Sequence, residues 1–505
     1  MSPGARPASI LILGGGTAGW LAANLFQHRW GKLGTRVALI ESSEIGIIGV
    51  GEGSTPQLKA FFETIGIAEA EWMPRCNATY KAGIGFLGWS ERPGFESYFH
   101  PFPSAADTHT ANKFFFNTQA RRTGRDVWAH PDRFFLNSAI AHQRLSPAAS
   151  DVPCPAGYGY HFDAVLLGRY LKEVATGRGV EHVDAKIASV ELGEGGDVVA
   201  LEADDGRRFE ADFFVDASGF QALIIEQALG EPRGSFESNL FNDRAVVTPT
   251  PLPPEGPGCC TLASAKSAGW IWHIPLTNRI GNGYVYSSRY IDRDAAAAEL
   301  RSHLGLGDDA EVRHLEMRVG RVERSWVRNC LAIGLAQGFL EPLEATAVHI
   351  VLTTVDELIA TIESNGSDDA ARERFNEAVA RRYEGIRDYI VCHYRTALRR
   401  DTDYWRDAGT LTDLSDSLKG IITTWFRGGE LDREVAEQDI GLYYSAVSWH
   451  CMLAGYGNFP DASKLSPPGP DAARVDMDEV DRFIAEAAKA FPPHAKALGM
   501  LEAAA

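Results

Sequence analysis

The first forty residues alternate between apolar runs and turn-forming residues. Residues 9–16, SILILGGG, predict a buried strand that ends in glycines, and residues 17–28 have the apolar spacing of a helix. Residues 35–41, TRVALIE, predict a second buried strand. A strand, a glycine turn, a helix and a strand in this order begin a parallel, doubly wound sheet.

The same patterns continue along the chain and predict an α/β protein. Residues 42–56 are too rich in Gly, Ser and Ile for a regular element and indicate a long functional loop, whereas residues 240–330 are rich in predicted strands. The remaining predicted elements are a helix over 161–175, strands over 182–192, 198–203 and 209–219, a strand, glycine turn and apolar helix over 329–360, and amphipathic helices over 370–400 and 478–491. We expect a Rossmann-like core over 1–360, with an inserted substrate region over about 90–160, and a mostly helical substrate-binding module over 361–505.

Composition narrows the class of protein. Over 505 residues, 49 Lys and Arg against 67 Asp and Glu give a net charge of −18. Nucleic acids and anionic membranes attract clustered cations, so neither is expected as a partner. The apolar runs are shorter than the ~20 residues of a membrane span, and the N-terminal stretch does not match a signal peptide. The seven cysteines form no CxxC pair, so we expect reduced thiols, no metal site and a cytoplasmic location. The expected oligomeric state is a monomer or a homodimer.

Residues 14–19, GGGTAG, fit the dinucleotide-binding pattern GxGxxG. Gly14 would form the tight turn, Gly16 would let the backbone approach a pyrophosphate, and Gly19 would let the helix pack closely on the strand. The free N–H groups at the helix start would bind phosphate oxygens. Glu41, at the end of the second strand, is expected to accept hydrogen bonds from both ribose hydroxyls. This context favours a nucleotide over a glycine-rich turn that binds nothing.

Two later glycine turns favour FAD over NAD. VDASG (215–219) is a strand that runs into small residues, and LAIGLAQGFLEP (331–342) is a second turn from a strand to a helix. Several such segments suit a large, tightly held flavin better than an exchanging nicotinamide. Taken singly, each segment is equally compatible with a simple turn.

Five short motifs, with one longer segment, are typical of a single enzyme family. They are GGGTAGW (14–20), GVGEGSTP (49–56), TYK (79–81), GWIWHIP (269–275) and FLEPLEAT (339–346). Together with HYRTALRRDTDYW (393–405), they make the chain resemble, over nearly its whole length, the flavin-dependent halogenases of the tryptophan-halogenase type. GxGxxG is generic to flavoproteins, whereas the WxWxIP pattern is quite specific to this family.

The resemblance implies roles for individual residues. Lys81 matches the catalytic lysine of the family, and Glu344 matches its catalytic glutamate. The other implied assignments are halide binding at Thr346 and Ala347, FAD contacts at Thr17, Ala18, Ile187, Leu335 and Val348, a substrate pocket at His100, Phe102 and Trp449, and a wall beside the flavin at Trp270 and Trp272. Simple core packing remains an alternative for the two tryptophans of the wall, which share one face of a strand.

The chemistry explains why a lysine and a glutamate are needed. Aromatic halogenation requires an electrophilic halogen, whereas halide is a nucleophile. The resemblance implies that reduced FAD and O2 oxidise halide to hypohalous acid, which is relayed inside the protein to Lys81. Glu344 would stabilise the cationic ring and accept the proton that it loses. The alternatives are a solvated lysine at a strand edge and a carboxylate that complements a helix dipole, a role for which Glu341 is the better candidate.

Two residues depart from the family pattern FxxPxxSxG. Ala345 replaces its serine, and Ala347 replaces its final glycine. Ala345 offers no hydroxyl, and Ala347 lacks the freedom of glycine to adopt positive φ. We therefore expect weak halide binding and a preference for bromide, which is easier to oxidise and to desolvate than chloride.

The expected cofactors are FAD, used as reduced FAD, together with O2 and bromide or chloride. No NAD(P) site is evident, so a separate flavin reductase would supply the reduced FAD. Two other functions remain open. An aromatic monooxygenase on the same scaffold would need neither Lys81 nor the segment GWIWHIP, and a flavoprotein that binds FAD without turnover is kept open by Ala345 and Ala347.

The expected substrate is an indole-like aromatic without a zwitterion. In tryptophan-specific relatives, the C-terminal helical segment supplies aromatic contacts and a carboxylate for the amino group. The corresponding residues 443–460, YYSAVSWHCMLAGYGNFP, contain aromatic side chains but no Asp or Glu. An ammonium buried there without an anion would lose solvation for little return. The alternative is that Glu434, Glu437 or Asp439 supplies the charge.

Overall fold

The computed structural model describes residues 6–44, 51–149, 152–468 and 475–500. The chain forms two compact units, and each is assembled from three separate segments. Unit 1 contains Met1–Ala78, Phe162–Glu237 and Met317–Glu384, and unit 2 contains Thr79–His161, Ser238–Glu316 and Gly385–Ala505. The expected domains over 1–360 and 361–505 stay a prediction.

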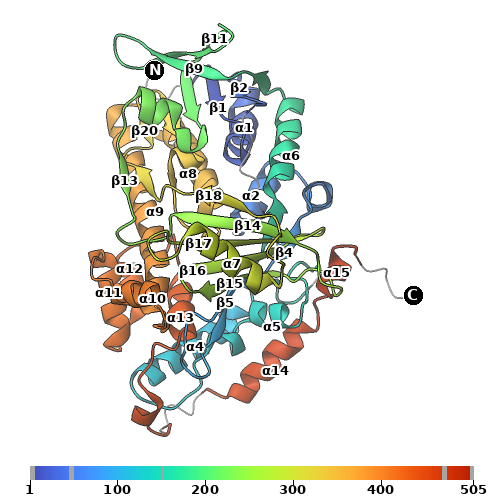
Figure 1. Ribbon diagram of the computed structural model, residues 1–505, viewed down its shortest axis with the longest axis vertical. Coiled ribbons are helices and arrows are strands. Elements are labelled where there is room, and N and C mark those ends of the chain that lie inside the picture. The colour runs from blue at the N-terminus through green and yellow to red at the C-terminus, as the bar shows by residue number, and fades with distance from the viewer. Residues whose placement is uncertain (1–5, 45–50, 150–151, 469–474, 501–505) are drawn as a thin grey trace. The chain divides into compact units, whose positions relative to one another are not determined.

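Unit 1 is built around a six-stranded sheet in the order β20-β21-β12-β1-β2-β8. Its elements are β1 (Ser9–Leu13), α1 (Thr17–Trp30), β2 (Arg36–Glu41), β8 (Glu181–Asp184), β12 (Phe213–Asp216), β20 (Trp326–Val327) and β21 (Cys330–Ala332). All pairs are parallel except β20 with β21. Figure 1 shows β1 and β2 with α1 close by. The central strands are buried because their runs are apolar on both faces, as parallel strands require. The predicted α/β, Rossmann-like fold is confirmed.

The remaining elements of unit 1 flank this sheet. They are β3 (Gly51–Gly53), α2 (Gln57–Thr64), α3 (Glu69–Trp72), α6 (Ala164–Gly177), β9 (Ile187–Leu192), β10 (Val198–Ala203), β11 (Arg208–Glu210), β13 (Arg233–Ser235), β19 (Gly320–Val322), β22 (Gly338–Phe339) and α8 (Thr346–Asn365). The strand predicted over 182–192 is wrong as a single strand, because β8 belongs to the parallel sheet and β9 pairs with β10. Similarly, residues 209–219 contain the separate strands β11 and β12.

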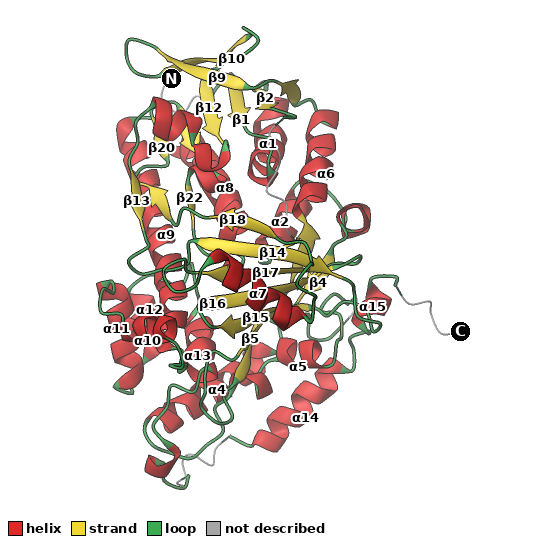
Figure 2. Cartoon of the chain, viewed as in Figure 1, coloured by secondary structure: helices red, strands yellow, loops and turns green. Residues whose placement is uncertain are grey.

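Unit 2 contains a seven-stranded sheet in the order β18-β14-β17-β16-β15-β5-β6 (Figure 2). Its strands are β5 (Gly83–Leu87), β6 (Ser97–Pro101), β14 (Arg244–Thr250), β15 (Cys260–Lys266), β16 (Gly269–Pro275), β17 (Ile280–Tyr286) and β18 (Arg313–Glu316). Nearby, β4 (Thr79–Lys81) pairs antiparallel with the first residues of β7 (Gly159–Asp163). The β-rich character expected over 240–330 comes mainly from this sheet.

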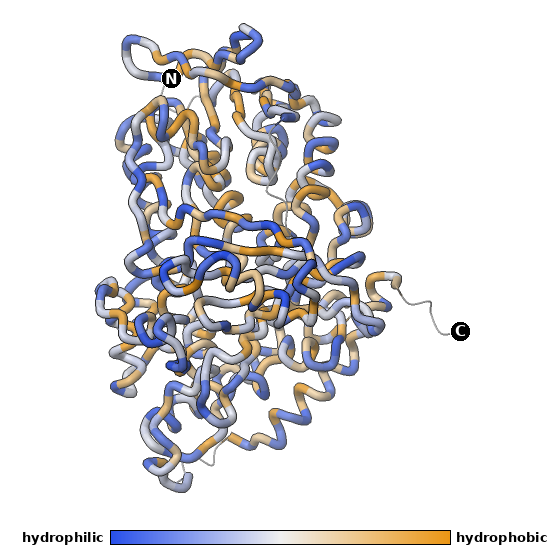
Figure 3. The backbone as a smooth tube through the Cα atoms, viewed as in Figure 1, coloured by the Kyte–Doolittle hydropathy of each residue, from blue (hydrophilic) through white to orange (hydrophobic). Residues whose placement is uncertain are grey.

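Helices from all three segments of unit 2 complete this unit. They are α4 (Asp107–Arg122), α5 (Leu136–His142), α7 (Arg293–Leu304), α10 (Asp403–Thr410), α11 (Asp416–Phe426), α12 (Leu431–Glu437), α13 (Ala446–Gly455), α14 (Met477–Ala488) and α15 (His494–Ala497). Helix α9 (Asp369–Thr396) crosses the boundary between the two segments at residue 384. In α14, Val480, Ile484 and Ala488 are buried on one face, and the alternation of its hydropathy is visible in Figure 3. Within the described residues, none of the helices combines the length and apolar character that a bilayer crossing requires.

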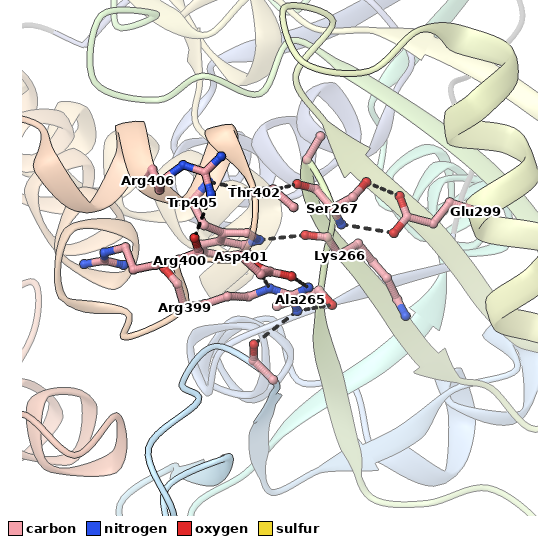
Figure 4. A network of polar contacts seen from close by, with 12 residues as sticks. Ala265, Lys266, Ser267, Glu299, Arg399, Arg400, Asp401, Thr402, Trp405 and Arg406 are labelled. Atoms are coloured by element: carbon pink, nitrogen blue, oxygen red, sulfur yellow. Dashed lines mark hydrogen bonds and ion pairs between the residues drawn. The ribbon is translucent and has the colours of Figure 1, made fainter.

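The connection between α9 and α10 is fastened to the turn between β15 and β16. The hydroxyl of Thr402 donates to the carbonyl of Ser267 at 2.7 Å, and the indole Nε1 of Trp405 donates to the carbonyl of Lys266 at 2.7 Å (Figure 4). Arg399 adds longer contacts of 3.3 Å to the carbonyl of Ala265 on β15 and to the carbonyl of Gly88, which directly follows β5. These contacts explain the structural part played by the motif DTDYW, which holds the C-terminal helices on the sheet of unit 2.

Candidate active-site residues

The glycine loop after β1 has the close packing that GxGxxG predicts. Gly14 has φ +118°, and a Cβ there would overlap the carbonyl of Ala217. A Cβ on Gly19 would overlap the carbonyl of Gly14, so the helix α1 sits against the turn. By contrast, no heavy atom of the described residues lies within 4 Å of a Cβ built on Gly16. The loop is therefore packed tightly on the strand side and open at the position expected to face a pyrophosphate.

Glu41 ends β2 beside this loop and carries partners that the sequence did not predict. Its Oε1 accepts from Lys172 Nζ at 2.7 Å and lies 3.0 Å from His182 Nε2. Its carboxylate also occupies the space into which a Cβ on Gly15 would point. Lys172 and His182 therefore fix the orientation of Glu41, while its ribose-binding role stays a prediction. A lysine on a helix face gives no sequence signal for such a contact.

The segment VDASG owes its shape to a buried carboxylate. Asp216 accepts hydrogen bonds from the backbone N–H groups of Ser218, Ile224 and Ile225 at 2.8 to 3.0 Å, and from the Ser218 hydroxyl at 2.6 Å. Burial raises the pKa of this carboxyl, although the four hydrogen bonds oppose the shift. Asp216 thus anchors the turn that packs against Gly14.

The segment from β21 to α8 positions the candidate halide and glutamate residues. A Cβ on Gly334, which has φ +60°, would overlap the methyl group of Ala18, so the turn carrying Leu335 lies against the glycine loop. Further along, Glu344 is 6% exposed and ends a short 3₁₀ turn. Thr346 is buried at the start of α8, Ala347 is exposed and Val348 is buried.

Between Glu344 and Val348 the residue with left-handed geometry is Ala345, whereas the sequence placed the need for positive φ at Ala347. Ala345 has φ 55° and ψ 38°, whereas Ala347 lies in the first turn of α8 with helical geometry. The 3₁₀ turn ends at Glu344 and α8 begins at Thr346, so the positive φ falls on the single residue between them. The missing freedom of glycine therefore matters at residue 345.

Ile187 lies at the start of β9, where it is partly buried. Its side chain packs against the apolar core that includes Leu13, Ile40 and Phe214. Its assignment as an FAD contact stays a prediction.

Lys81 is fully buried in unit 2, with 0% of its surface exposed. The interpretation as a solvated lysine at a strand edge is therefore wrong. Its Nζ lies 5.3 Å from the centroid of the Phe102 ring, within range of a cation–π interaction. The next residue, Ala82, donates its N–H to Cys259 at 2.7 Å and accepts from the N–H of Phe102 at 2.9 Å. The lysine strand is thus held on both sides.

The other two substrate candidates meet through a tyrosine that the sequence did not single out. His100 lies 6.2 Å from Tyr389, and Trp449 lies 4.8 Å from the same ring, edge to face. Tyr444 stacks on Tyr389 with 3.5 Å between ring centroids. Trp449 is 2% exposed, and its indole Nε1 has no acceptor among the described residues. Tyr389 was missed because a tyrosine on an amphipathic helix usually indicates packing alone.

Trp270 and Trp272 are buried in β16, as the wall hypothesis and the core alternative both require. Their ring centroids lie 6.3 Å apart, and Trp272 spreads over Gly283 of the neighbouring strand. A Cβ on Gly283 would overlap the indole ring. Among the described residues, no group of three His, Cys, Asp or Glu side chains is arranged to hold a metal ion.

Known proteins resemble this chain in sequence and in structure. The profile of the family described as tryptophan halogenase matches residues 9–467. The chain is 37% identical over 446 residues to tryptophan 6-halogenase SttH of Streptomyces toxytricini, covering 83% of this chain and 84% of that protein. It is 33% identical over 503 residues to tryptophan 7-halogenase RebH of Lentzea aerocolonigenes, covering 93% of each. The structure of BrvH, a flavin-dependent halogenase from Brevundimonas sp. BAL3, matches with a TM-score of 0.82 at 32% identity and covers 98% of this chain and 99% of that one.

Proposed function

Since the chain belongs to the tryptophan halogenase family, whose members are flavin-dependent enzymes, we propose that it halogenates an indole-like aromatic with reduced FAD, O2 and halide. The observation that carries this proposal is the complete burial of Lys81. Burying an ammonium costs solvation energy, so a fold without a use for the charge would favour an apolar side chain at residue 81.

Unit 1 has the features that binding of FAD requires. The loop is open at Gly16, the N–H groups at the start of α1 suit a pyrophosphate, and Glu41 is oriented by Lys172. FAD, when bound in its reduced form, supplies with O2 the oxidising power that turns halide into hypohalous acid. The absence of an evident NAD(P) pattern supports a separate reductase as the source of reduced FAD.

The proposed task of Lys81 is to hold hypohalous acid by hydrogen bonding, or to carry the halogen as a haloamine, until the substrate is attacked. Its complete burial and the Phe102 ring keep water from competing for the halogen. Glu344 is proposed to stabilise the cationic ring and accept the ring proton. Its burial supports this role, because a carboxylate removed from water interacts more strongly with a nearby cation.

Thr346 and Ala347 are proposed to bind halide at the start of α8, where backbone N–H groups favour an anion. The absence of a hydroxyl at Ala345 supports weak halide binding and the preference for bromide. Turnover with chloride that equals or exceeds turnover with bromide at matched concentration would contradict this preference.

The substrate pocket is proposed to involve His100, Phe102 and Trp449 and to take a neutral indole. Two of the carboxylates named above as alternatives for binding an ammonium have other partners. Glu434 accepts from Gln438 at 2.6 Å and from Thr424 at 3.0 Å, and Glu437 pairs with Arg433 at 3.6 Å.

One assay tests the function against its alternatives. The enzyme is supplied with FAD, a flavin reductase, O2, indole, and bromide or chloride, and the product mass is measured. We expect a product whose mass rises by one halogen in place of one hydrogen and only when halide is present. A hydroxylated product would show a monooxygenase, and flavin reoxidation without any modified product would show that the protein does not halogenate.

A further inference from the structure

His161 is a buried histidine in unit 2 that none of the roles above uses. It lies on β7, opposite Thr79 of β4, and its exposed fraction is 0%. Its Nδ1 lies 3.0 Å from the hydroxyl of Thr79, and its Nε2 lies 2.9 Å from the hydroxyl of Thr261 on β15. Both ring nitrogens are therefore engaged by threonine hydroxyls inside the protein.

The hydrogen bond of Thr79 to a carbonyl fixes the tautomer of this ring. The Thr79 hydroxyl donates its only proton to the carbonyl of Pro275 at 2.7 Å. It can then only accept from His161, so Nδ1 carries the ring proton. Burial, followed by the charges of Lys81, His494 and His273, lowers the pKa of His161 well below its usual value, so Nε2 is free to accept from Thr261. The result is a series of hydrogen bonds that run in one direction, from Thr261 to His161, from His161 to Thr79 and from Thr79 to the carbonyl of Pro275.

These hydrogen bonds join strands that lie in different sheets. Thr79 is on β4, Thr261 is on β15, and Pro275 ends the strand β16 that carries GWIWHIP. Lys81 follows Thr79 by two residues on β4. Residues two apart on a strand share a face, and the burial of both Thr79 and Lys81 agrees with this. The orientation of the lysine side chain therefore depends on how β4 is set against β15 and β16.

We propose that His161 is a positioning residue for Lys81, which it holds in place by linking Thr79 and Thr261 across three strands. The proposal rests on the proposed function, because it gives His161 a part in delivering halogen through the lysine. A neutral ring suits this task, since it completes the series of hydrogen bonds without adding a second positive charge beside the ammonium of Lys81. On the far side of Lys81, the hydrogen bonds of Ala82 complete the positioning of the strand.

Conservative and disruptive variants separate positioning from general packing. His161→Leu removes both contacts, whereas His161→Asn keeps an N–H near the position of Nδ1 for Thr79. Thr79→Val removes the hydroxyl but keeps the shape, and Thr79→Ser restores the hydroxyl. Thr396→Val is the matched control, because its buried hydroxyl bonds only to Cys392 of its own helix.

The expected result is a loss of halogen transfer with flavin chemistry intact. For His161→Leu and Thr79→Val, kcat for halogenation should fall about tenfold or more, because small displacements of reacting groups are costly. KM for the aromatic and the rate of flavin reoxidation should stay within about twofold of wild type. Thr79→Ser and Thr396→Val should match wild type, and His161→Asn should fall between. A wild-type kcat in Thr79→Val, or an equal fall of kcat and flavin reoxidation, would overturn the proposal.

Two measurements without cofactor or turnover keep the proposal separate from the proposed function. In ¹⁵N-histidine spectra, His161 should show the Nδ1–H tautomer in wild type and lose it in Thr79→Val. Acetic anhydride should acetylate Lys81 faster in Thr79→Val and His161→Leu than in wild type, relative to the exposed Lys419 as internal standard. An Nε2–H or charged ring in wild type, or unchanged acetylation, would overturn the positioning role. A wild-type enzyme that fails to halogenate any aromatic would overturn the proposed function alone.

Discussion

At the scale of the residue, Lys81 is a charge that the fold holds at a cost. Lys81→Met keeps a long, flexible side chain and removes the ammonium, so halogenation should fall by more than about 10²-fold, as expected when a group that touches the reacting atom is lost. The free energy of unfolding, compared between the variant and wild type, separates a loss of chemistry from a loss of structure. Product formation, flavin reoxidation and urea unfolding are measured together. Lys419→Met, at an exposed site on α11, is the control and should change none of them. Halogenation at the wild-type rate would remove Lys81 from the relay.

Glu344 is the second buried charge with a proposed role. Glu344→Gln keeps the shape and removes the charge, so kcat should fall by about 10²-fold or more through the loss of base and electrostatic contributions. The matched control is Glu373→Gln, because Glu373 is exposed on α9 and should tolerate the change. An unchanged kcat in Glu344→Gln would assign the role to another carboxylate.

Ala345 and Ala347 should respond with opposite signs to the same substitution. Ala345→Gly relieves an alanine held at φ 55° and should stabilise the protein by about 1 kcal/mol. Ala347→Gly places a glycine in the first turn of α8 and should destabilise it by about 0.5–1 kcal/mol. The midpoint of urea unfolding of each variant, compared with wild type, shows whether the substitution stabilises or destabilises the protein. Stabilisation by Ala347→Gly would contradict the assignment of strain to residue 345.

At the scale of the element, one asparagine holds the strand after Lys81. Asn137 is buried in α5, and its Nδ2 donates to the carbonyls of Ala82, Phe102 and Gly157 at 2.8 to 3.1 Å. Asn137→Ala leaves these contacts unmade and should destabilise unit 2 by about 2–4 kcal/mol. Hydrogen exchange of residues 79–102 and urea unfolding test this prediction. Asn365→Ala, at an exposed helix end, should leave hydrogen exchange and the free energy of unfolding unchanged. Equal hydrogen exchange in the two variants would contradict the role of Asn137 in holding this strand.

Elements with strong periodicity could be predicted from the sequence, and the contacts between them could not. The strand, turn and helix around residues 9–30 are confirmed, because their apolar runs and glycines have one stable solution in a parallel sheet. The break between β8 and β9 was missed, because both strands have a continuous β pattern and only their pairing separates them. The partners of His161 were also missed, since hydrogen bonds between strands distant in sequence leave no periodic signal.

At the scale of the whole molecule, the two units interleave along the chain. A linear reading of composition places boundaries where helices follow strands, whereas each compact unit draws on three segments. The sequence therefore predicts each motif separately, and the structure assigns each motif to one of the two units. The glycine loop and Glu344 belong to unit 1, and Lys81, His100 and Trp449 belong to unit 2.

The proposed preference for a neutral substrate rests on which elements of unit 2 carry charged side chains. The segment 443–460 contains no acid, and its aromatic side chains Tyr444 and Trp449 contact Tyr389 of α9. An ammonium moved from water into these surroundings loses solvation that a flat aromatic pocket does not return, and the cost amounts to several kcal/mol. Indole should therefore be halogenated with a higher kcat/KM than free tryptophan when the two compete in one reaction.

A charge-supplying variant sharpens this competition. Ser448→Asp introduces a carboxylate beside Trp449, and it should raise kcat/KM for tryptophan relative to indole, because the ammonium then gains an ionic partner. Ser448→Asn has nearly the same shape without the charge and is the matched control, for which no such shift is expected. The ratio of halogenated tryptophan to halogenated indole, measured by mass in the same reaction, reports the preference directly. If wild type already favours tryptophan, an acid outside residues 443–460 must hold the ammonium, and Glu434 and Glu437 would have to leave their present partners for either of them to be that acid.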